Sequence, residues 1–441
     1  MRSLKDVYAT VPLGDLKVGR SVTRKDAVFD GVSRRMVSES YSLEDMNKAF
    51  LPIEDNDFGI QSQIRALFGK RGFNRNVIGG HPHFVHLEEQ GARSNGYVVT
   101  LFMDIKGSTK LGLLYDAETV FFIKNQIIKC AIETVGAFDG HVHRIMGDAV
   151  LAFFRSNGES PRNSAIDAVN CGAYLVEFMR QVVRPTLEQL SLAEDVGIRI
   201  GIDYGPEEQV LWGMYGYRGA SEVTATSFYV DVAAKLQQCA PKNRVMLGAS
   251  IRDLLDLHEG VVETHYVVRD GVKEEELYVA PNYTIPGEGA INYKKYVLSQ
   301  KAYYDLLPKP EWEDRPIRIS GTLKAGKDLI SDDQYYACSR RIDKPYGIDF
   351  KAVFNLSGSF DKVLVKFRVV NNGQEALDNA GSSRDDHESF VEAIQRPSGE
   401  YFAHRWERTN YVGLHYMYVS VWVASSMLIK EQCYGVYVGP D

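Results

Sequence analysis

The stretch FMDIKGSTKL, residues 102–111, carries an acid and a turn rich in small residues directly after an apolar run. The preceding residues YVVTL are apolar or β-prone, which predicts a buried strand that ends at Asp104. Gly107, Ser108 and Thr109 then favour a turn into a helix, because serine and threonine are common where helices begin. An acid between a buried strand and such a turn is a candidate ligand-binding residue.

A second acid stands in a comparable place. The stretch HVHRIMGDAVLAFF, residues 141–154, predicts two short strands joined by a tight turn at Gly147 and Asp148. If these strands neighbour the strand that ends at Asp104, the two carboxylates meet at one edge of a sheet. Two close carboxylates suit Mg²⁺ or Mn²⁺, and free backbone N–H groups of the Gly-Ser-Thr turn suit a triphosphate. A lone strand-end aspartate is more often a cap or a surface acid, so the prediction rests on the combination.

Composition narrows the function classes. The chain has 441 residues, 44% of them hydrophobic and 25% charged, and a net charge of −7, which disfavours a nucleic acid polymer as partner. The five cysteines are scattered without CxxC spacing, as expected for thiols in a reducing cytoplasm. No apolar run approaches the ~20 residues that span a bilayer, and the start lacks a signal-peptide core. We therefore expect a cytoplasmic protein without membrane insertion.

The chain divides into segments of different pattern. The central segment alternates strands and helices, which predicts an α/β sandwich with a mainly antiparallel sheet. The last segment has the rhythm of a β-sandwich. The expected boundaries are 1–92 for an N-terminal extension with weak helical patterns at 42–53 and 59–73, 93–285 for the α/β domain, 286–316 for a linker and 317–441 for the β-rich domain.

Motifs of the central segment carry a family resemblance. They occur in the order and spacing of the catalytic domains of class III nucleotide cyclases, over roughly residues 93–285. The resemblance implies an α+β fold, the ferredoxin-like or palm-type sandwich of that family. The motifs are FMDIKGST at 102–109, HRIMGDAVLAFF at 143–154, GIRIGIDYGP at 197–206 and TATSFYVDVAAKLQ at 224–237.

The resemblance implies a reaction and its ligands. Family members bind two divalent metal ions, Mn²⁺ or Mg²⁺, through aspartates that map onto Asp104 and Asp148 and through the carbonyl of Ile105. The ribose 3′-oxygen attacks the α-phosphate of a nucleoside triphosphate, and pyrophosphate leaves. The family completes each site across a homodimer, with the metals held by one subunit and the base read by the other.

The residues expected to read the base point to a pyrimidine. Arg144 stands four residues before Asp148, where adenylyl cyclases carry Lys and guanylyl cyclases Glu, and Thr224 falls on the second base-reading position. Arginine only donates hydrogen bonds, so it fits the acceptor edge of uracil or cytosine, and Tyr97 is expected to lie near the base. In this respect the chain resembles the pyrimidine cyclases of bacterial antiphage defence. UTP is favoured over CTP; an adenylyl cyclase and a catalytically inactive nucleotide-binding module stay as alternatives.

Other positions depart from the family pattern. Asp231 and Lys235 replace the Asn that orients the ribose and the Arg that stabilises the reacting phosphate, and lysine lacks the bidentate fork of arginine. Arg269 falls near a late basic residue that grips the terminal phosphates; a solvated hairpin charge is the alternative. The histidines of HVH at 141–143 are expected to be structural, and GMYGYRG at 213–219 is expected to be a loop.

The last segment resembles the sensor domain that follows cyclases and related nucleotidyltransferases in bacterial defence operons. The resemblance implies an enzyme that detects infection and makes a cyclic nucleotide as second messenger, which then activates a separate effector protein. The alternative is a generic immunoglobulin-like sandwich without its own ligand. The supporting stretches are FKAVFNLSG at 350–358, VLVKFRVVNNGQEA at 363–376 and RTNYVGLHYMYVSVWV at 408–423.

Overall fold

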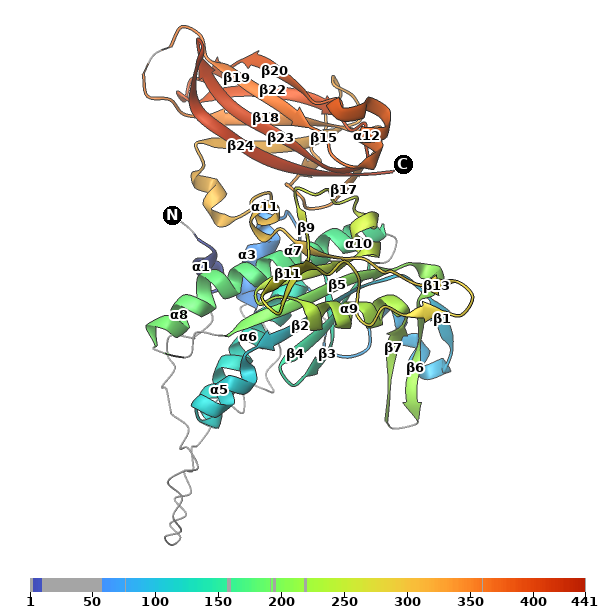
Figure 1. The fold of residues 1–441 in the computed structure, drawn as a ribbon. Helices are drawn as coiled ribbons and strands as arrows, with labels where there is room; N and C mark the ends of the chain where they lie inside the picture. Colours follow the sequence, from blue (N-terminus) through green and yellow to red (C-terminus); the bar gives the residue numbers. More distant parts are fainter. Residues whose placement is uncertain are drawn as a thin grey trace.

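The structure is a computed structural model that describes residues 3–9, 58–75, 77–156, 160–190, 192, 196–217, 220–358 and 360–440. An α/β domain forms one half of the molecule and a β-sandwich the other, with helices between them (Figure 1). The helical pattern expected at 42–53 lies outside the described residues. Among the described residues, no helix is long and apolar enough to cross a membrane.

A seven-stranded sheet forms the centre of the α/β domain, in the order β3-β4-β2-β5-β8-β14-β9. Of its pairings, β5 with β8 is parallel and the others are antiparallel, so the predicted mainly antiparallel sheet is confirmed. The strands are β2 (Val98–Lys106), β3 (His141–Met146), β4 (Ala149–Phe154), β5 (Gly197–Gly205), β8 (Arg244–Gly248), β9 (Val262–Thr264) and β14 (Lys295–Leu298).

Helices cover both faces of this sheet because its strands are apolar on both sides. Val99, Leu101 and Met103 of β2 share a buried core with α6 and α7, whereas α9 packs on the other face, across β2 and β5. The predicted alternation of strands and helices in this segment is confirmed. The helices of this domain are α5 (Ser108–Leu114), α6 (Ala117–Ala137), α7 (Pro161–Phe178), α8 (Arg184–Gln189), α9 (Phe228–Cys239) and α10 (Ala249–Leu254).

Gly201 sets how closely α9 approaches β5. A Cβ atom added at Gly201 would lie 2.3 Å from the carbonyl oxygen of Ala233 and 2.3 Å from the amide nitrogen of Gln237, both backbone atoms of α9. Backbone cannot move aside like a flexible side chain. Glycine at this position therefore fixes the seating of α9 on the sheet.

Gly201→Ala is expected to lower the free energy of unfolding by about 1–3 kcal/mol, because the added methyl group forces α9 away from β5. Gly112→Ala is the matched control, since a Cβ at Gly112 of α5 meets nothing within 4 Å; it should be neutral or stabilise by about 0.5–1 kcal/mol. Urea unfolding followed by circular dichroism measures both. Equal stability of the two variants would contradict the close seating of α9.

A separate small sheet stands out from the domain as an arm, on the side away from the β-sandwich (Figure 1). It is formed by β1 (Arg93–Asn95), β6 (Leu211–Tyr217) and β7 (Ala220–Thr226). Trp212 and Val223 are buried against Phe84. The expectation of a loop at 213–219 is wrong where β6 continues to Tyr217, because pairing with β7 satisfies this glycine-rich backbone and aromatic residues favour strands.

The expected linker at 286–316 is also wrong in part. β14 lies between β8 and β9, so residues 295–298 are an inner strand of the seven-stranded sheet. Next comes α11 (Gln300–Tyr304), whose Tyr303 is fully buried. Prolines and glycines around these elements favoured the prediction of a linker. The elements themselves are only four and five residues long, which is too short to show a clear periodicity.

The N-terminal segment contributes to the same core rather than standing apart from it. Helix α3 (Gly59–Leu67) confirms the pattern expected at 59–73, and its Ile60 and Ile64 are buried in the main core cluster. Its amphipathic face packs on α6. Other described elements before residue 93 are α1 (Leu4–Val7), η4 (Pro82–Phe84) and α4 (His86–Gln90).

Two five-stranded sheets form the C-terminal domain, in the orders β16-β15-β18-β22-β21 and β17-β24-β23-β19-β20. The predicted β-sandwich is therefore confirmed. Its strands are β15 (Ile317–Lys324), β16 (Gln334–Tyr335), β17 (Arg341–Asp343), β18 (Gly347–Phe354), β19 (Leu364–Val370), β20 (His387–Glu392), β21 (Ile394–Gln395), β22 (Tyr401–Arg408), β23 (Gly413–Val423) and β24 (Ser426–Gly439), with the short helix α12 (Gln374–Ala380). In the chain, two small hairpins lie between β9 and β14 of the α/β domain: β10 (Tyr266–Arg269) with β11 (Val272–Glu275), and β12 (Thr284–Ile285) with β13 (Gly289–Ala290).

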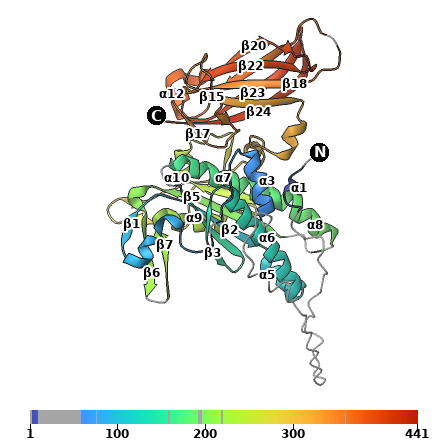
Figure 2. The same cartoon turned by 180° about the vertical axis from the view of Figure 1, so that it is seen from behind.

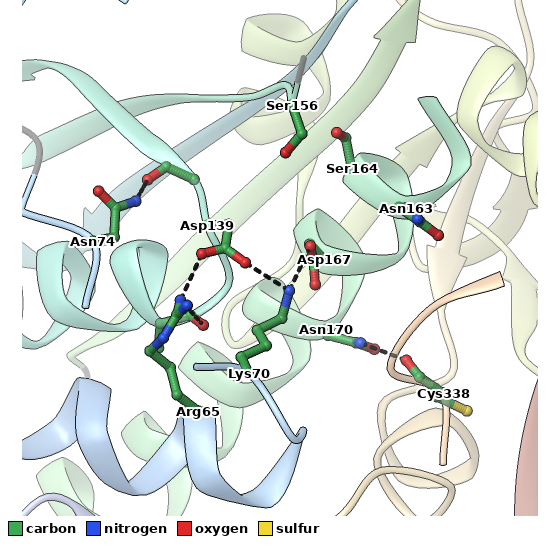
Figure 3. A network of polar contacts seen from close by, with 12 residues as sticks. Arg65, Lys70, Asn74, Asp139, Ser156, Asn163, Ser164, Asp167, Asn170 and Cys338 are labelled. Atoms are coloured by element: carbon green, nitrogen blue, oxygen red, sulfur yellow. Dashed lines mark hydrogen bonds and ion pairs between the residues drawn. The ribbon is translucent and has the colours of Figure 1, made fainter. Parts of the chain in front are cut away.

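Helix α7 joins the two domains through buried polar contacts. The Asn170 side chain donates to the Cys338 carbonyl at 2.9 Å (Figure 3) and accepts from the Tyr303 hydroxyl at 2.8 Å. Leu414 and Tyr437 of the sandwich belong to the same core cluster as α7. One continuous core therefore runs from the central sheet into the C-terminal domain.

A charged network ties the N-terminal segment to the same helix. The Lys70 ammonium lies 2.8 Å from the Asp139 carboxylate and 2.9 Å from that of Asp167 on α7, and Arg65 also pairs with Asp139 (Figure 3). The buried Asp167 and the partly exposed Asp139 thus each have a cation nearby. The segment before residue 93 is bonded to the α/β domain at this corner.

Candidate active site

The two predicted acids lie at one corner of the sheet. Asp104 of β2 is paired with Ala149 of β4, the residue after Asp148, and the Ile105 amide donates to the Asp148 carbonyl at 3.2 Å. Gly147 of the β3–β4 turn has φ +66°, a conformation that glycine adopts without strain. The predicted tight hairpin is confirmed, and it brings Asp148 beside the end of β2.

Each acid has a cationic neighbour that the sequence reasoning missed. The Arg199 guanidinium on β5 donates from Nε to Asp104 Oδ2 at 3.2 Å and contacts the same oxygen with a second nitrogen. Lys124 Nζ of α6 lies 3.7 Å from Asp148 Oδ2. The arginine inside the apolar strand GIRIGIDYG was the available signal, since a charge in a buried strand needs a partner. Among the described residues, Asp104 Oδ1 receives no hydrogen bond.

These groups fit divalent metal ions. Both carboxylates are partly exposed, and the Ile105 carbonyl leaves its strand on the same side as its amide, toward Asp148. No group of three or more His, Cys, Asp or Glu side chains gathers at one point in the part of the chain that the structure describes. Two carboxylates and a carbonyl leave several positions for water and phosphate oxygens, which is the way Mg²⁺ usually binds beside nucleotides.

The predicted Gly-Ser-Thr turn directly follows β2. Gly107 has φ +90° and precedes α5, which begins at Ser108. The first amides of a helix have no partner inside the helix, and here no side chain caps them. Among the described residues, the N–H groups of Ser108 and Thr109 therefore have no partner, and they lie shortly after Asp104 in the chain.

Arg144 and Thr224, the expected base-reading residues, lie on adjoining elements. Arg144 on β3 contacts the carboxylate of Glu222 on β7. Glu222 and Thr224 are two residues apart on one strand and share a face, while Val223 between them is buried. The structure thus brings Arg144 and Thr224 into one region and adds Glu222, for which the sequence reasoning had no signal.

Tyr97 is placed differently from the expectation. It precedes β2, at the end of that strand opposite Asp104, and only 5% of its surface is exposed. Its hydroxyl contacts the Ser156 carbonyl at 3.1 Å and the Ser164 hydroxyl at 3.1 Å, and Arg155 lies over its ring. The structure therefore does not bring Tyr97 to the acid pair of its own chain, because this large aromatic at the start of an inner strand is buried against α7.

Asp231 and Lys235 lie one turn apart on α9. Asp231 is exposed, and Lys235 Nζ lies 5.3 Å from the centre of the Tyr283 ring. No contact is found between either side chain and the acid pair of the same chain among the described residues. Arg199 connects the two places, since its NH1 donates to the Gln238 carbonyl of α9 at 3.2 Å.

Arg269 lies in the exposed β10–β11 hairpin. Its guanidinium is 2.7 Å from Glu276 and 3.4 Å from Glu274. The hairpin follows β9, the edge strand opposite β3. The structure therefore does not bring Arg269 to the acid pair of its own chain.

His141 and His143 both bond to the Gly79 carbonyl, His141 through Nε2 at 2.9 Å and His143 through Nδ1 at 2.9 Å. Burial lowers the pKa of both imidazoles. These contacts fasten β3 to the segment at Gly79, as the structural interpretation of HVH expected.

Two family models match this chain, one over each domain. Residues 91–281 match the family model of the adenylate and guanylate cyclase catalytic domain, and residues 300–439 match that of the adenylyl/guanylyl and SMODS C-terminal sensor domain. The second match begins at α11, before the expected boundary at 317.

Full-length relatives are also similar to this chain. A cytidylate cyclase of Escherichia coli is 41% identical over 410 residues, covering 89% of this chain and 86% of the relative. A cytidylate cyclase of Staphylococcus aureus is 31% identical over 428 residues, covering 94% and 96%. The crystal structure of the adenylyl cyclase CyaB from P. aeruginosa is 18% identical with a TM-score of 0.38, covering 47% of this chain and 95% of that one. The chain belongs to the class III nucleotide cyclases in which the catalytic domain precedes this sensor domain.

Proposed function

We propose that the chain converts CTP into 3′,5′-cyclic CMP and pyrophosphate. The observation that carries the proposal is the acid pair, with Asp104 Oδ1 unbonded among the described residues, beside the uncapped helix start at Ser108. CTP comes first because the relatives similar over most of the chain are named cytidylate cyclase. UTP is the second candidate, since the donors of Arg144 fit uracil as well as cytosine.

Each residue at the corner has a part in this reaction. Asp104, Asp148 and the Ile105 carbonyl would hold two divalent ions, Mn²⁺ or Mg²⁺. When bound, these ions would lower the pKa of the ribose 3′-hydroxyl and neutralise negative charge on the triphosphate. The amides of Ser108 and Thr109 bind phosphate oxygens. The 3′-oxygen forms a bond to the α-phosphorus, the bond to the β-phosphate oxygen breaks, and the hydroxyl proton passes to solvent.

The groups on α9 complete the site from the other subunit of a homodimer. Lys235 places positive charge at the reacting phosphates, and Asp231 accepts a hydrogen bond from a ribose hydroxyl. Arg269 of the β10–β11 hairpin is proposed to grip the terminal phosphates from the partner. The separation of these residues from the acid pair within one chain supports a shared site.

Exposed apolar side chains around Arg144 and Thr224 also support a dimer. Ile145 and Met146 at the end of β3 are exposed, as are Tyr215 and Tyr217 of the arm. All belong to elements on the side of the molecule that faces away from the β-sandwich (Figures 1 and 2). A second copy related by a two-fold axis would cover this side and create two equivalent sites.

The sensor domain places this activity in signalling. We propose that the cyclase acts in the cytoplasm, in antiphage defence, where its product activates a separate effector protein. Helix α7 packs on β2 of the catalytic sheet and bonds to the sensor domain through Asn170, which gives the sensor a physical connection to the site.

The test is to incubate the full chain with Mn²⁺ and each of the four nucleoside triphosphates, and to separate the products by chromatography. Cyclic CMP as the main product is the expected result, because both the relatives and the site favour a pyrimidine. Cyclic AMP as the main product would return the chain to the adenylyl class. Absence of product from every nucleotide, with the triphosphates still bound, would indicate an inactive binding module.

A further inference from the structure

Glu222 occupies an unusual place for a charged surface residue. Its Oε1 contacts the Arg144 guanidinium, and the side chains of Arg144 and Glu222 are 45% and 35% exposed. A half-exposed pair of this kind contributes only about 0.2–1 kcal/mol to stability. Fold stability is therefore a weak reason for this pairing at the base-reading position.

The second carboxylate oxygen of Glu222 is available to a ligand. No hydrogen bond to Oε2 is found in the described part of the chain. His143 Nε2 lies 3.9 Å from Glu222, but His143 Nδ1 must carry the imidazole proton, because it donates to the Gly79 carbonyl. Burial lowers the His143 pKa, which favours the neutral ring, in which Nε2 is an acceptor. Glu222, an acceptor, thus lies beside Arg144, a donor, and its Oε2 can accept a hydrogen bond from a ligand.

Cytosine and uracil differ in the groups that meet such a pair. Cytosine presents an amino donor at N4 next to acceptors at N3 and O2, whereas uracil presents an acceptor at O4 and a donor at N3. Arg144 alone fits acceptors on either base. When Arg144 donates to N3 and O2 of cytosine, Glu222 accepts from the N4 amine. Uracil in the same pose would place its O4 lone pairs against the carboxylate and its N3–H against the guanidinium.

We propose that Glu222 reads the N4 amine of cytosine while Arg144 donates to its acceptor edge, so that this pair selects CTP over UTP. The inference rests on the proposed pyrimidine cyclase function. Thr224 lies on the same face of β7 as Glu222 and is paired with Gly213 of β6, so the two polar side chains can reach one ligand.

Glu222→Gln tests the proposal, because the amide keeps the size of the side chain and offers a donor that suits O4. The ratio of kcat/KM for CTP to that for UTP should fall roughly tenfold to a hundredfold, as for loss of one good base-reading pair. Glu431→Gln is the matched control: Glu431 also pairs with an arginine, Arg368 at 2.7 Å, and is 29% exposed, but lies in the sensor domain. It should leave the ratio unchanged.

Binding of 3′-deoxy-CTP and 3′-deoxy-UTP gives a readout without chemistry, since both lack the attacking hydroxyl. Wild-type chain should bind the cytidine analogue more tightly, and Glu222→Gln should remove that difference. An unchanged ratio in the variant, with both activities lowered together, would show that Glu222 only positions Arg144 and would overturn the inference. A wild-type preference for UTP would overturn it too. Wild-type chain that binds the cytidine analogue selectively but forms no cyclic product would instead contradict the proposed function.

Discussion

Asp104→Asn and Asp148→Asn are each expected to lower cyclase turnover by about a thousandfold, because each removes an ionised ligand whose metal supplies several kcal/mol of transition-state stabilisation. The Asp104→Asn, Asp148→Asn double variant should be little worse than either single one, since groups that act as a unit are not additive. Initial rates of cyclic nucleotide formation at saturating Mn²⁺ measure the loss.

Two further measurements separate a lost ligand from a damaged fold. Mn²⁺ binding, followed by electron paramagnetic resonance with CTP present, should weaken in both variants, while circular dichroism stays unchanged. Asp253→Asn is the control, because Asp253 is an exposed carboxylate that pairs with Arg252 on α10 and lies outside the site. Turnover within a factor of a few of wild type in Asp104→Asn would remove the acid pair from the mechanism.

Mixing an Asp104→Asn chain with an Arg144→Ala chain is expected to restore about a quarter of wild-type activity. In a two-fold dimer with shared sites, half of the chains form mixed dimers, and each mixed dimer has one site in which both the acids and the base-reading residues are intact. Each variant alone should be nearly inactive. Rates are measured after the chains are mixed at equal concentration and allowed to exchange.

A double variant carrying both substitutions serves as the control for this mixing. Combined with either single variant it cannot form an intact site, so activity should stay at the level of the single variants. Failure of the two single variants to rescue one another, although mixed dimers form, would mean that each chain builds its site alone.

The sequence predicted the parts of the fold and site that depend on local pattern. Asp104 on the first strand and Asp148 in a tight turn were identified because strand periodicity and turn chemistry act over a few residues. The expected strand end at Asp104 is wrong by two residues, because pairing with β5 extends β2 to Lys106. Strand β14 was missed because only its two neighbours, β8 and β9, identify it as a strand.

Long-range contacts explain the other differences. Arg199 contacts Asp104, which is 95 residues earlier in the sequence, and Glu222 contacts Arg144, which is 78 residues earlier. No local sequence pattern encodes contacts over such separations. The sequence around Tyr97 is typical of an aromatic residue at a strand edge, yet Tyr97 is buried against α7. Burial by a distant helix cannot be read from the residues around Tyr97.

Helix α7 has a thermodynamic consequence for signalling. Since it belongs both to the core beneath β2 and to the contact at Cys338, a ligand of the sensor domain that favours one arrangement of this shared core would also act on the cyclase. Linkage then requires reciprocity: the factor by which such a ligand changes nucleotide affinity is the factor by which nucleotide changes the affinity for that ligand. The occupancy of the catalytic site would therefore set the concentration at which the sensor responds.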